Sequence, residues 1–147
     1  CSLDMIDGEV LQRRWRNRPE ISEETYLAVV ARKTASLISG CCRAGALLAG
    51  ADRARVEALG RFGTSLGTAF QVIDDVLDAE GNTATLGKTA GKDAKDNKPT
   101  YAGIMGISGA RDFAYELKDR AEAALSELGD SAHRLGEIGR YIVERKF

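Results

Sequence analysis

Apolar residues recur every three to four positions along almost the whole chain, the spacing of one face of an α-helix. No strand-length run alternates apolar and polar residues, and two prolines in 147 residues impose few breaks. The pattern predicts an all-α chain without internal repeats or domain linkers. The expected helices cover residues 2–14, 22–50 and 51–81, a short segment after Pro99, residues 108–128, and a last segment ending in YIVERKF.

The expected helix over residues 22–50 carries one polar interruption. Ser22 is its predicted N-cap, followed by two glutamates in the first turn. Between Leu27 and Leu48 it is apolar on most sides, which predicts a buried helix. Arg32, Lys33 and Thr34 break this apolar run. Long basic side chains can extend from a buried helix to solvent. The functional alternative is that Lys33 binds a phosphate inside a cavity.

The segment VIDDVLD places three carboxylates among residues that favour burial. On a helix over residues 60–79, four polar residues share an arc of roughly 100°: Gln71, Asp74, Asp75 and Asp78. Three glycines precede them on the same arc: Gly60, Gly63 and Gly67. One interpretation is a tight helix crossing at the glycines with the aspartates at its solvent end. However, interior glycines, adjacent like charges and acids near a helix C-terminus are all unfavourable.

Several unfavourable local choices at one place indicate function. Carboxylate and amide oxygens, without histidine or cysteine, suit Mg²⁺ shared with phosphate oxygens. The glycines then leave room beside a cavity or mark a helix contact. The segment therefore predicts a platform for a metal and a phosphate group.

A loop rich in glycine and lysine follows the acidic helix, GNTATLGKTAGKDAKDNKP. Its four lysines would return toward the aspartates: Lys88, Lys92, Lys95 and Lys98. Lysines beside metal-binding carboxylates are favourable when a polyanion lies between them, and a solvated loop is the alternative. The tetrapeptide LGKT is not the end of a P-loop, because the spacing to Gly81 is too long and a helix precedes it.

Composition narrows the class of protein. The net charge of −1 does not favour nucleic acid or an anionic membrane as partner. Three cysteines, two of them the adjacent Cys41 and Cys42, make a poor disulfide framework and predict reduced thiols in the cytoplasm. No apolar run is long enough to span a membrane. Because the first residue is Cys1 and the opening is already helical, we expect the latter part of a longer chain.

FQVIDDVLD followed by LGKTAGKDAKDNKPTY, with ARKTASLI and GEVLQ upstream, strongly resembles the trans-isoprenyl diphosphate synthases, the polyprenyl synthetase family. The resemblance covers essentially the whole chain. It implies an all-α isoprenoid synthase-type helical bundle around a deep central cavity. In that family Mg²⁺ ionises an allylic diphosphate, isopentenyl diphosphate attacks the cation, and proton loss leaves a product five carbons longer. It also implies a homodimer, and the cysteine pattern has already indicated a cytoplasmic protein.

The resemblance assigns a role to each matching residue. The metal ligands would be Asp74, Asp75 and Asp78, with Asp93 acting through water. Four residues would contact the allylic diphosphate and take part in catalysis: Lys33, Thr34, Gln71 and Lys88. Lys98 would help to neutralise diphosphate, and Arg145 and Lys146 would cover the isopentenyl diphosphate site. No side-chain base is needed, because the departing diphosphate can accept the proton.

Two departures from the family pattern shape the expected activity. The family's first DDxxD motif is absent, so residues 1–147 correspond to the C-terminal portion of one domain and are expected not to catalyse alone. GEVLQ, with Glu9 and Gln12, resembles long-chain synthases, whose short-chain relatives favour GQxxD. KPTYAGIMGISGAR and the short C-terminal run resemble farnesyl and geranylgeranyl diphosphate synthases, so a short-chain product is favoured.

Three alternatives remain open on the sequence. The first is a long-chain polyprenyl diphosphate synthase. The second is a non-catalytic regulatory subunit of such a synthase, although the intact aspartate motif weighs against it. The third is a class I terpene cyclase, which shares the fold and metal chemistry. The lysines of GK and KPT weigh against a cyclase, which has no isopentenyl diphosphate to bind.

Overall fold

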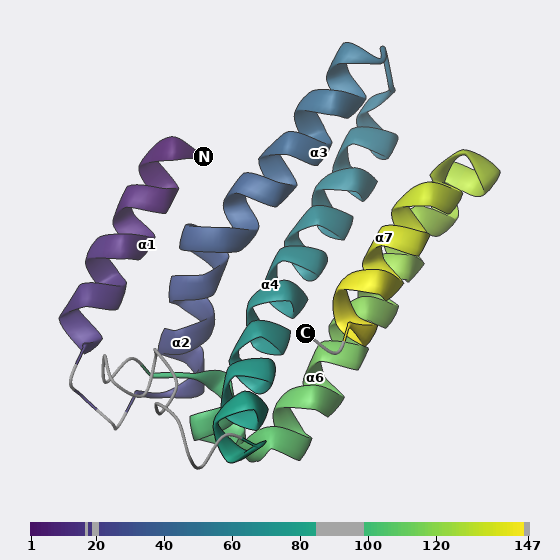
Figure 1. Ribbon diagram of the computed structural model, residues 1–147. Coiled ribbons are helices and arrows are strands. Elements are labelled where there is room, and N and C mark those ends of the chain that lie inside the picture. The colour runs from purple at the N-terminus through teal and green to yellow at the C-terminus, as the bar shows by residue number, and fades with distance from the viewer. Residues whose placement is uncertain (17, 19–20, 85–98, 146–147) are drawn as a thin grey trace.

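The structure, a computed structural model, describes residues 1–16, 18, 21–84 and 99–145, and these contain helices and no strand (Figure 1). The predicted all-α class is therefore confirmed for this part of the chain. In order, the elements are α1 (Ser2–Trp15), α2 (Glu23–Val30), the π-helical η1 (Ala31–Ala35), α3 (Ser36–Leu48), α4 (Arg53–Ala84), α6 (Tyr101–Leu125), the 3₁₀-helical η2 (Ser126–Ala132) and α7 (His133–Glu144).

Short-range signals set several of the helix ends. The Ser22 side chain accepts a hydrogen bond from the backbone N–H of Thr25 at 3.2 Å, which confirms the predicted cap of α2. Thr100 caps α6 in the same way, accepting from the Gly103 N–H at 3.1 Å. The chain leaves α3 through Gly50, whose φ of 73° is in the left-handed region that favours glycine.

Three predicted boundaries differ from the structure, and one of them is the end of α6 at Leu125 rather than at Leu128. Helix α4 continues to Ala84, past the end predicted at Gly81. The two helices predicted after Pro99 form one element, α6, broken at Gly106, where φ is 75° and ψ is 162°. Glycine permits this break without the steric cost that a side chain would add.

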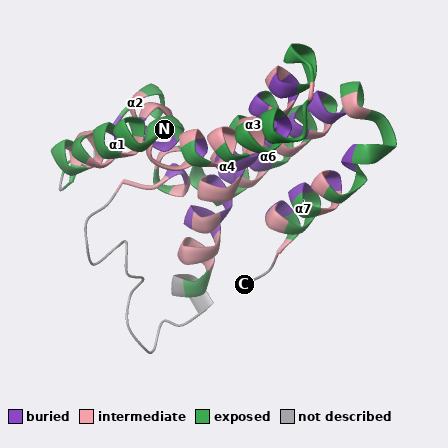
Figure 2. Cartoon of the chain, turned by 90° about the horizontal axis from the view of Figure 1, so that it is seen from above, coloured by how far each residue is buried: buried purple, intermediate pink, exposed green. Residues whose placement is uncertain are grey.

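Helix α4 is the central element, packed against α3 on one side and α6 on the other (Figure 1). Buried positions run along α4 and α6, with partners from α2 and α7 (Figure 2). Burial of apolar surface is the main favourable term here, at about 25 cal/mol per Å². The buried cluster around the lower half of α4 comprises Ile21, Tyr26, Val30, Ala69, Val72, Ile73, Val76, Tyr101, Ala110, Ala114, Leu117 and Val143.

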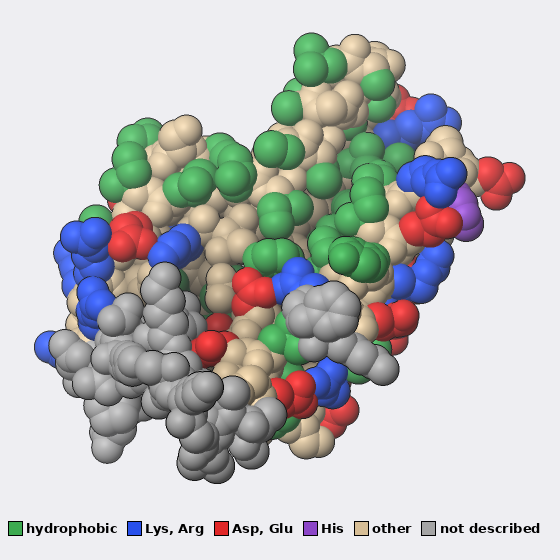
Figure 3. Space-filling model, viewed as in Figure 1, with side chains coloured by type: hydrophobic (Ala, Val, Ile, Leu, Met, Phe, Trp, Pro, Cys, Tyr) green, Lys and Arg blue, Asp and Glu red, His purple; other side chains and the backbone are tan. Residues whose placement is uncertain are grey.

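The expected burial of the helix over residues 22–50 is only half right. Its α2 part is buried at Tyr26, Val29 and Val30, but α3 keeps one apolar side open, with Leu47 64% and Leu48 90% exposed. The physical reason is that, among the described elements, α3 packs mainly on α4, so one flank has no neighbour. Figure 3 shows hydrophobic side chains gathered over α1 and the upper part of α3. Among the described helices, none is both long and apolar enough to cross a membrane.

Candidate functional site

Residues distant in sequence meet around one small cavity at the junction of α1, η1 and α4. Its volume is about 20 Å³, room for roughly one water. Four of the residues that line it are predicted site residues: Lys33, Thr34, Gln71 and Asp75. The remainder of the wall is Gln12, Trp15, Ile21, Tyr26, Val29, Val30 and Pro99. The structure therefore brings Lys33 and Thr34, from the helix predicted over residues 22–50, next to Gln71 and Asp75 of α4.

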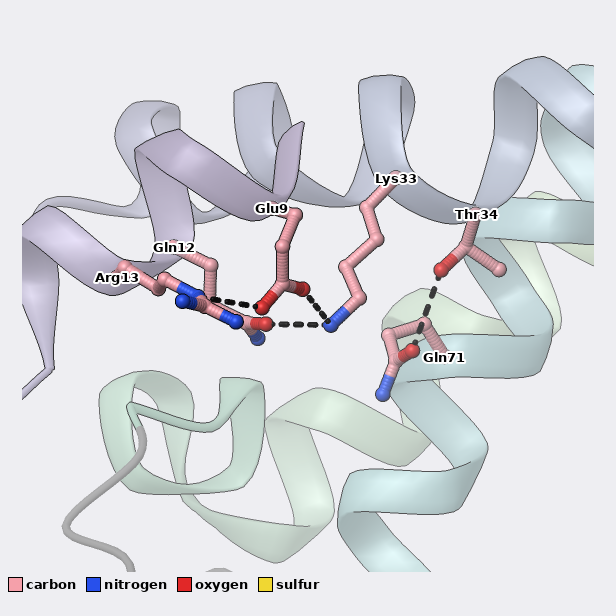
Figure 4. A network of polar contacts seen from close by, with 6 residues as sticks. All are labelled: Glu9, Gln12, Arg13, Lys33, Thr34 and Gln71. Atoms are coloured by element: carbon pink, nitrogen blue, oxygen red, sulfur yellow. Dashed lines mark hydrogen bonds and ion pairs between the residues drawn. The ribbon is translucent and has the colours of Figure 1, made fainter. Parts of the chain in front are cut away.

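Lys33 and Thr34 lie within the π-helical turn, a local widening that is frequent at functional sites. The hydroxyl of Thr34 donates to Gln71 Oε1 at 3.4 Å, and Gln71 Nε2 donates to Asp75 Oδ1 at 3.2 Å (Figure 4). This chain of contacts orients the Gln71 amide with its nitrogen toward the carboxylate. Hydrogen bonds thus link Thr34 and Gln71, two candidates for phosphate binding, to Asp75 on the acidic helix.

The Lys33 ammonium reaches across to α1 (Figure 4). Its Nζ donates to Gln12 Oε1 at 2.6 Å and pairs with Glu9 Oε2 at 2.8 Å. Hydrogen bonds first from Lys33 and then from Arg13 hold the pKa of Glu9 below its usual value. The side chains of Lys33 and Glu9 are 39% and 40% exposed, so solvent screens part of this pairing.

Asp75 is anchored inside the fold, only 1% exposed. Its Oδ2 accepts from the Tyr26 hydroxyl at 2.6 Å and from the Tyr101 N–H at 2.7 Å, while Oδ1 accepts from Gln71. The sequence groups Asp75 with the metal ligands, whereas the structure directs both of its oxygens to donors from α2, α4 and α6. The carboxylate joins these three helices at the start of α6.

Two tyrosines complete this buried network, and the sequence interpretation did not identify either. Burial, and next the Asp75 carboxylate, raise the pKa of Tyr26, so its hydroxyl keeps its proton and donates. The Tyr101 hydroxyl donates to Glu23 Oε1 at 2.5 Å, and burial together with this bond raises the Tyr101 pKa. The signals were present: Tyr26 is two turns before Lys33, and Tyr101 directly follows KPT.

Asp74 faces a different environment from its neighbour. Its side chain is 41% exposed and pairs with the Arg145 guanidinium, whose side chain is 15% exposed. The same guanidinium lies 4.5 Å from the centre of the Phe70 ring, a cation–π contact. The structure therefore brings Arg145, predicted to cover the second substrate, to the acidic helix, where it balances the charge of Asp74.

Asp78 is partly exposed one turn after Asp74, on the same side of α4. Four predicted site residues lie outside the described residues: Lys88, Asp93, Lys98 and Lys146. Across the described ranges, no three Asp, Glu, His or Cys side chains are close enough together to hold a metal. Asp74 and Asp78 could supply one or two oxygens to Mg²⁺, which commonly takes its remaining ligands from water and phosphate.

The glycine track on α4 is a helix contact rather than open space beside the cavity. A Cβ on Gly67 would lie 2.7 Å from Ala35 Cα, and one on Gly63 would lie 2.7 Å from Ser39 Cα. Gly60 faces only the flexible end of an arginine side chain. The alternative of a tight crossing is thus right for the glycines, while the aspartates beyond them are not simply a solvated end.

Comparison with known proteins matches residues 1–133 to the family model described as Polyprenyl synthetase. A probable farnesyl diphosphate synthase of Sinorhizobium fredii is 44% identical over 119 residues, which are 78% of this chain and 36% of the relative. The chain thus aligns with little more than a third of that curated relative.

Solved structures support the fold over nearly the whole chain. A decaprenyl diphosphate synthase from Rhodobacter capsulatus has a TM-score of 0.90 at 29% identity, covering 99% of this chain and 57% of its own. A polyprenyl synthase from Caulobacter crescentus, solved with calcium and isoprenyl diphosphate, has a TM-score of 0.86 at 31% identity, with coverages of 99% and 57%. The helical fold predicted from the resemblance is confirmed.

Proposed function

The chain belongs to the polyprenyl synthetase family, and on that premise we propose that it carries the diphosphate-binding part of a trans-prenyltransferase active site. The complete enzyme would condense an allylic diphosphate with isopentenyl diphosphate. The observation that carries the proposal is the meeting of Lys33, Thr34 and Gln71 at one cavity beside the acidic turn of α4. An ammonium, a hydroxyl and an amide are donors suited to phosphate oxygens.

Each residue has a proposed task. Lys33, Thr34 and Gln71 bind the allylic diphosphate at the exposed rim of the cavity, because about 20 Å³ holds a water but not a diphosphate. Asp74 and Asp78 hold Mg²⁺, which when bound supplies positive charge to stabilise the departing diphosphate. Asp75 is assigned to the scaffold that aims them. Matching roles are proposed for residues outside the described ranges: Lys88, Asp93, Lys98 and Lys146.

Arg145 has two compatible roles in this proposal. Without a metal its guanidinium balances the charge of Asp74, as their ion pair indicates. With a metal on Asp74, the same guanidinium becomes available to the diphosphate of the second substrate. A guanidinium presents a rigid fork of donors that matches phosphate geometry.

The site on this chain is half of a catalytic constellation. Its sequence contains one DDxxD motif, and the described residues offer at most two carboxylates to a metal. We therefore propose that residues 1–147 bind Mg²⁺ and diphosphate weakly and do not turn over substrate without the rest of a synthase domain. Assembly as a homodimer is proposed from the resemblance, and a cytoplasmic location is proposed from the cysteine pattern.

A short-chain product, farnesyl or geranylgeranyl diphosphate, is the specific form of the proposal. It is supported by the 44% identity with the probable farnesyl diphosphate synthase. The decaprenyl diphosphate synthase, similar in structure at 29% identity, represents the long-chain alternative. Chromatography of the products made by the complete enzyme from radiolabelled isopentenyl diphosphate distinguishes C15–C20 chains from longer ones.

Replacing Asp74 with asparagine tests the metal platform. We expect Mg²⁺-dependent binding of inorganic diphosphate, measured by isothermal titration calorimetry, to weaken by roughly tenfold or more, because one of few metal ligands is lost. Asp112→Asn is the matched control, since Asp112 is an exposed aspartate on α6. Equal affinities for the wild-type and Asp74→Asn proteins would contradict the platform, as would an equal loss in the Asp112 control.

A further inference from the structure

We propose that Glu9 and Gln12 of α1 act together as positioning residues for the Lys33 ammonium, presenting it to the diphosphate. The inference rests on the proposed function, in which Lys33 binds that diphosphate. It assigns a specific task in substrate binding to α1, a helix outside the acidic turn and the π-helical turn.

Glu9 and Gln12 together hold the Lys33 ammonium, and these two residues are called the clamp below. Lys33 Nζ contacts Gln12 Oε1 at 2.6 Å and Glu9 Oε2 at 2.8 Å. The second oxygen of Glu9 accepts from Arg13 Nε at 3.0 Å, so the carboxylate is itself held from the other side (Figure 4). Two side chains of α1 therefore hold one ammonium, and Arg13 in turn holds Glu9.

The backbone geometry fixes the distance between α1, which carries the clamp, and η1, which carries Lys33. A Cβ on Gly8 would lie 2.6 Å from the backbone nitrogen of Lys33. Helix α1 is thus as close to η1 as a glycine permits. Glu9 and Gln12 lie one and four residues after Gly8, and their side chains reach Nζ from that fixed base.

The clamp leaves the ammonium able to bind a ligand. A lysine ammonium has three N–H donors. Two point to α1 in the described structure, and the side chain also lines the cavity shared with Thr34 and Gln71. A lysine held in one conformation loses less freedom when it binds an anion than a freely rotating one. Glu9 also offsets the lysine charge while no anion is bound.

Glu9 and Gln12 should be interchangeable in this task, because both already contact the same nitrogen. Glu9→Gln removes the carboxylate from the clamp. The double variant Glu9→Gln/Gln12→Glu restores a carboxylate at a position 2.6 Å from Nζ in the wild type. A residue with a merely structural role at position 9 would not be rescued by a charge placed at position 12.

The first readout is the rate at which Lys33 is acetylated by N-hydroxysuccinimide acetate, followed by mass spectrometry of the peptide that contains it. We expect Glu9→Gln to raise this rate about fivefold, because the amine loses a charge-assisted hydrogen bond. The double variant is expected to return within about twofold of the wild type. Asp7→Asn, which removes an exposed carboxylate from the same helix, should leave the rate unchanged.

The second readout repeats the labelling of the same 147-residue chain with Mg²⁺ and inorganic diphosphate present. Protection of Lys33 in the wild type, reduced in Glu9→Gln and regained in the double variant, is the expected result. In the complete enzyme, Glu9→Gln should raise the KM for the allylic diphosphate about tenfold and leave that for isopentenyl diphosphate unchanged.

The two proposals fail in different ways. Equal labelling rates in the wild type and Glu9→Gln, or no rescue in the double variant, overturn the positioning role. A further outcome is that the acetylation rate changes among the variants as expected while diphosphate protects Lys33 in none of them. In that case the positioning role stands and the diphosphate site at Lys33 is wrong. Circular dichroism of each variant identifies any change that is due to unfolding.

Discussion

Replacing Asp75 with asparagine is expected to lower the free energy of unfolding by about 3 kcal/mol, whereas Asp74→Asn lowers it by about 1 kcal/mol. The two residues are adjacent and chemically identical, but Asp75 is 1% exposed while the Asp74 side chain is 41% exposed. The difference in their surroundings determines the difference in cost.

The Asp75→Asn substitution replaces a carboxylate, which only accepts hydrogen bonds, with an amide that has one accepting oxygen and one donating nitrogen. Several donors converge on this position. The hydroxyl of Tyr26 and the N–H of Tyr101 both point at Oδ2. An asparagine amide nitrogen at either oxygen position would set donor against donor, and a neutral oxygen accepts more weakly than a carboxylate. An unsatisfied buried donor then carries its full desolvation cost.

Urea unfolding followed by far-UV circular dichroism measures both variants. A double-mutant cycle with Tyr26→Phe tests the mechanism, because the tyrosine should contribute about 1 kcal/mol less once Asp75 is asparagine. Equal unfolding free energies for Asp75→Asn and Asp74→Asn would show that Asp75 is not an anchor. Additive effects in the cycle would show that the Tyr26 hydroxyl is not coupled to it.

Replacing Gly67 with leucine is expected to destabilise the protein by about 3 kcal/mol or more, as overpacking against backbone does. The first added carbon would already lie 2.7 Å from Ala35 Cα and 3.1 Å from Ala35 Cβ. Neither atom belongs to a flexible side chain, so η1 and α4 would have to move apart. Because Ala35 is the last residue of η1, that movement would directly shift the turn that carries Lys33 and Thr34.

The matched control is Gly45→Leu on the exposed side of α3. Nothing lies within 4 Å of a Cβ at Gly45, so leucine there should leave stability unchanged or raise it by about 0.5 kcal/mol through helix propensity. Urea unfolding compares the two variants, and product analysis in the complete enzyme shows whether the displaced π-helical turn alters chain length. An unchanged unfolding free energy and product for Gly67→Leu would contradict the close crossing.

Much of the candidate site could be predicted from sequence because it breaks local rules. Lys33 and Thr34 interrupt an apolar run, and Gln71 shares an arc with three aspartates at helical spacing. Such features need only the 3.6-residue period of a helix and the residue types themselves. The same holds for the Ser22 cap, whose side chain bonds three residues ahead.

Other features depend on which helices become neighbours. The sequence pattern allowed two interpretations of the α4 glycines, spare room beside a cavity or a helix contact. The close approach of Ala35 in η1 and Ser39 in α3 decided for the contact. The exposure of Leu47 and Leu48 likewise follows from the packing of α3 on one side, although a pattern that is apolar on most sides predicted a buried helix. Glu9 and Gln12 appeared only as markers of product length until the structure placed them on Lys33.

The sequence by itself determined the helical class, the order of the helices, the main caps and the chemistry gathered at VIDDVLD, because these depend on local periodicity and residue type. Tertiary structure alone distinguished Asp75 from Asp74. Successive residues of a helix point about 100° apart. That rotation turns one carboxylate toward the buried tyrosines and the other toward Arg145 and solvent. Their roles diverge because a carboxylate enclosed by donors stabilises the fold, while an accessible one can exchange its partner for a metal.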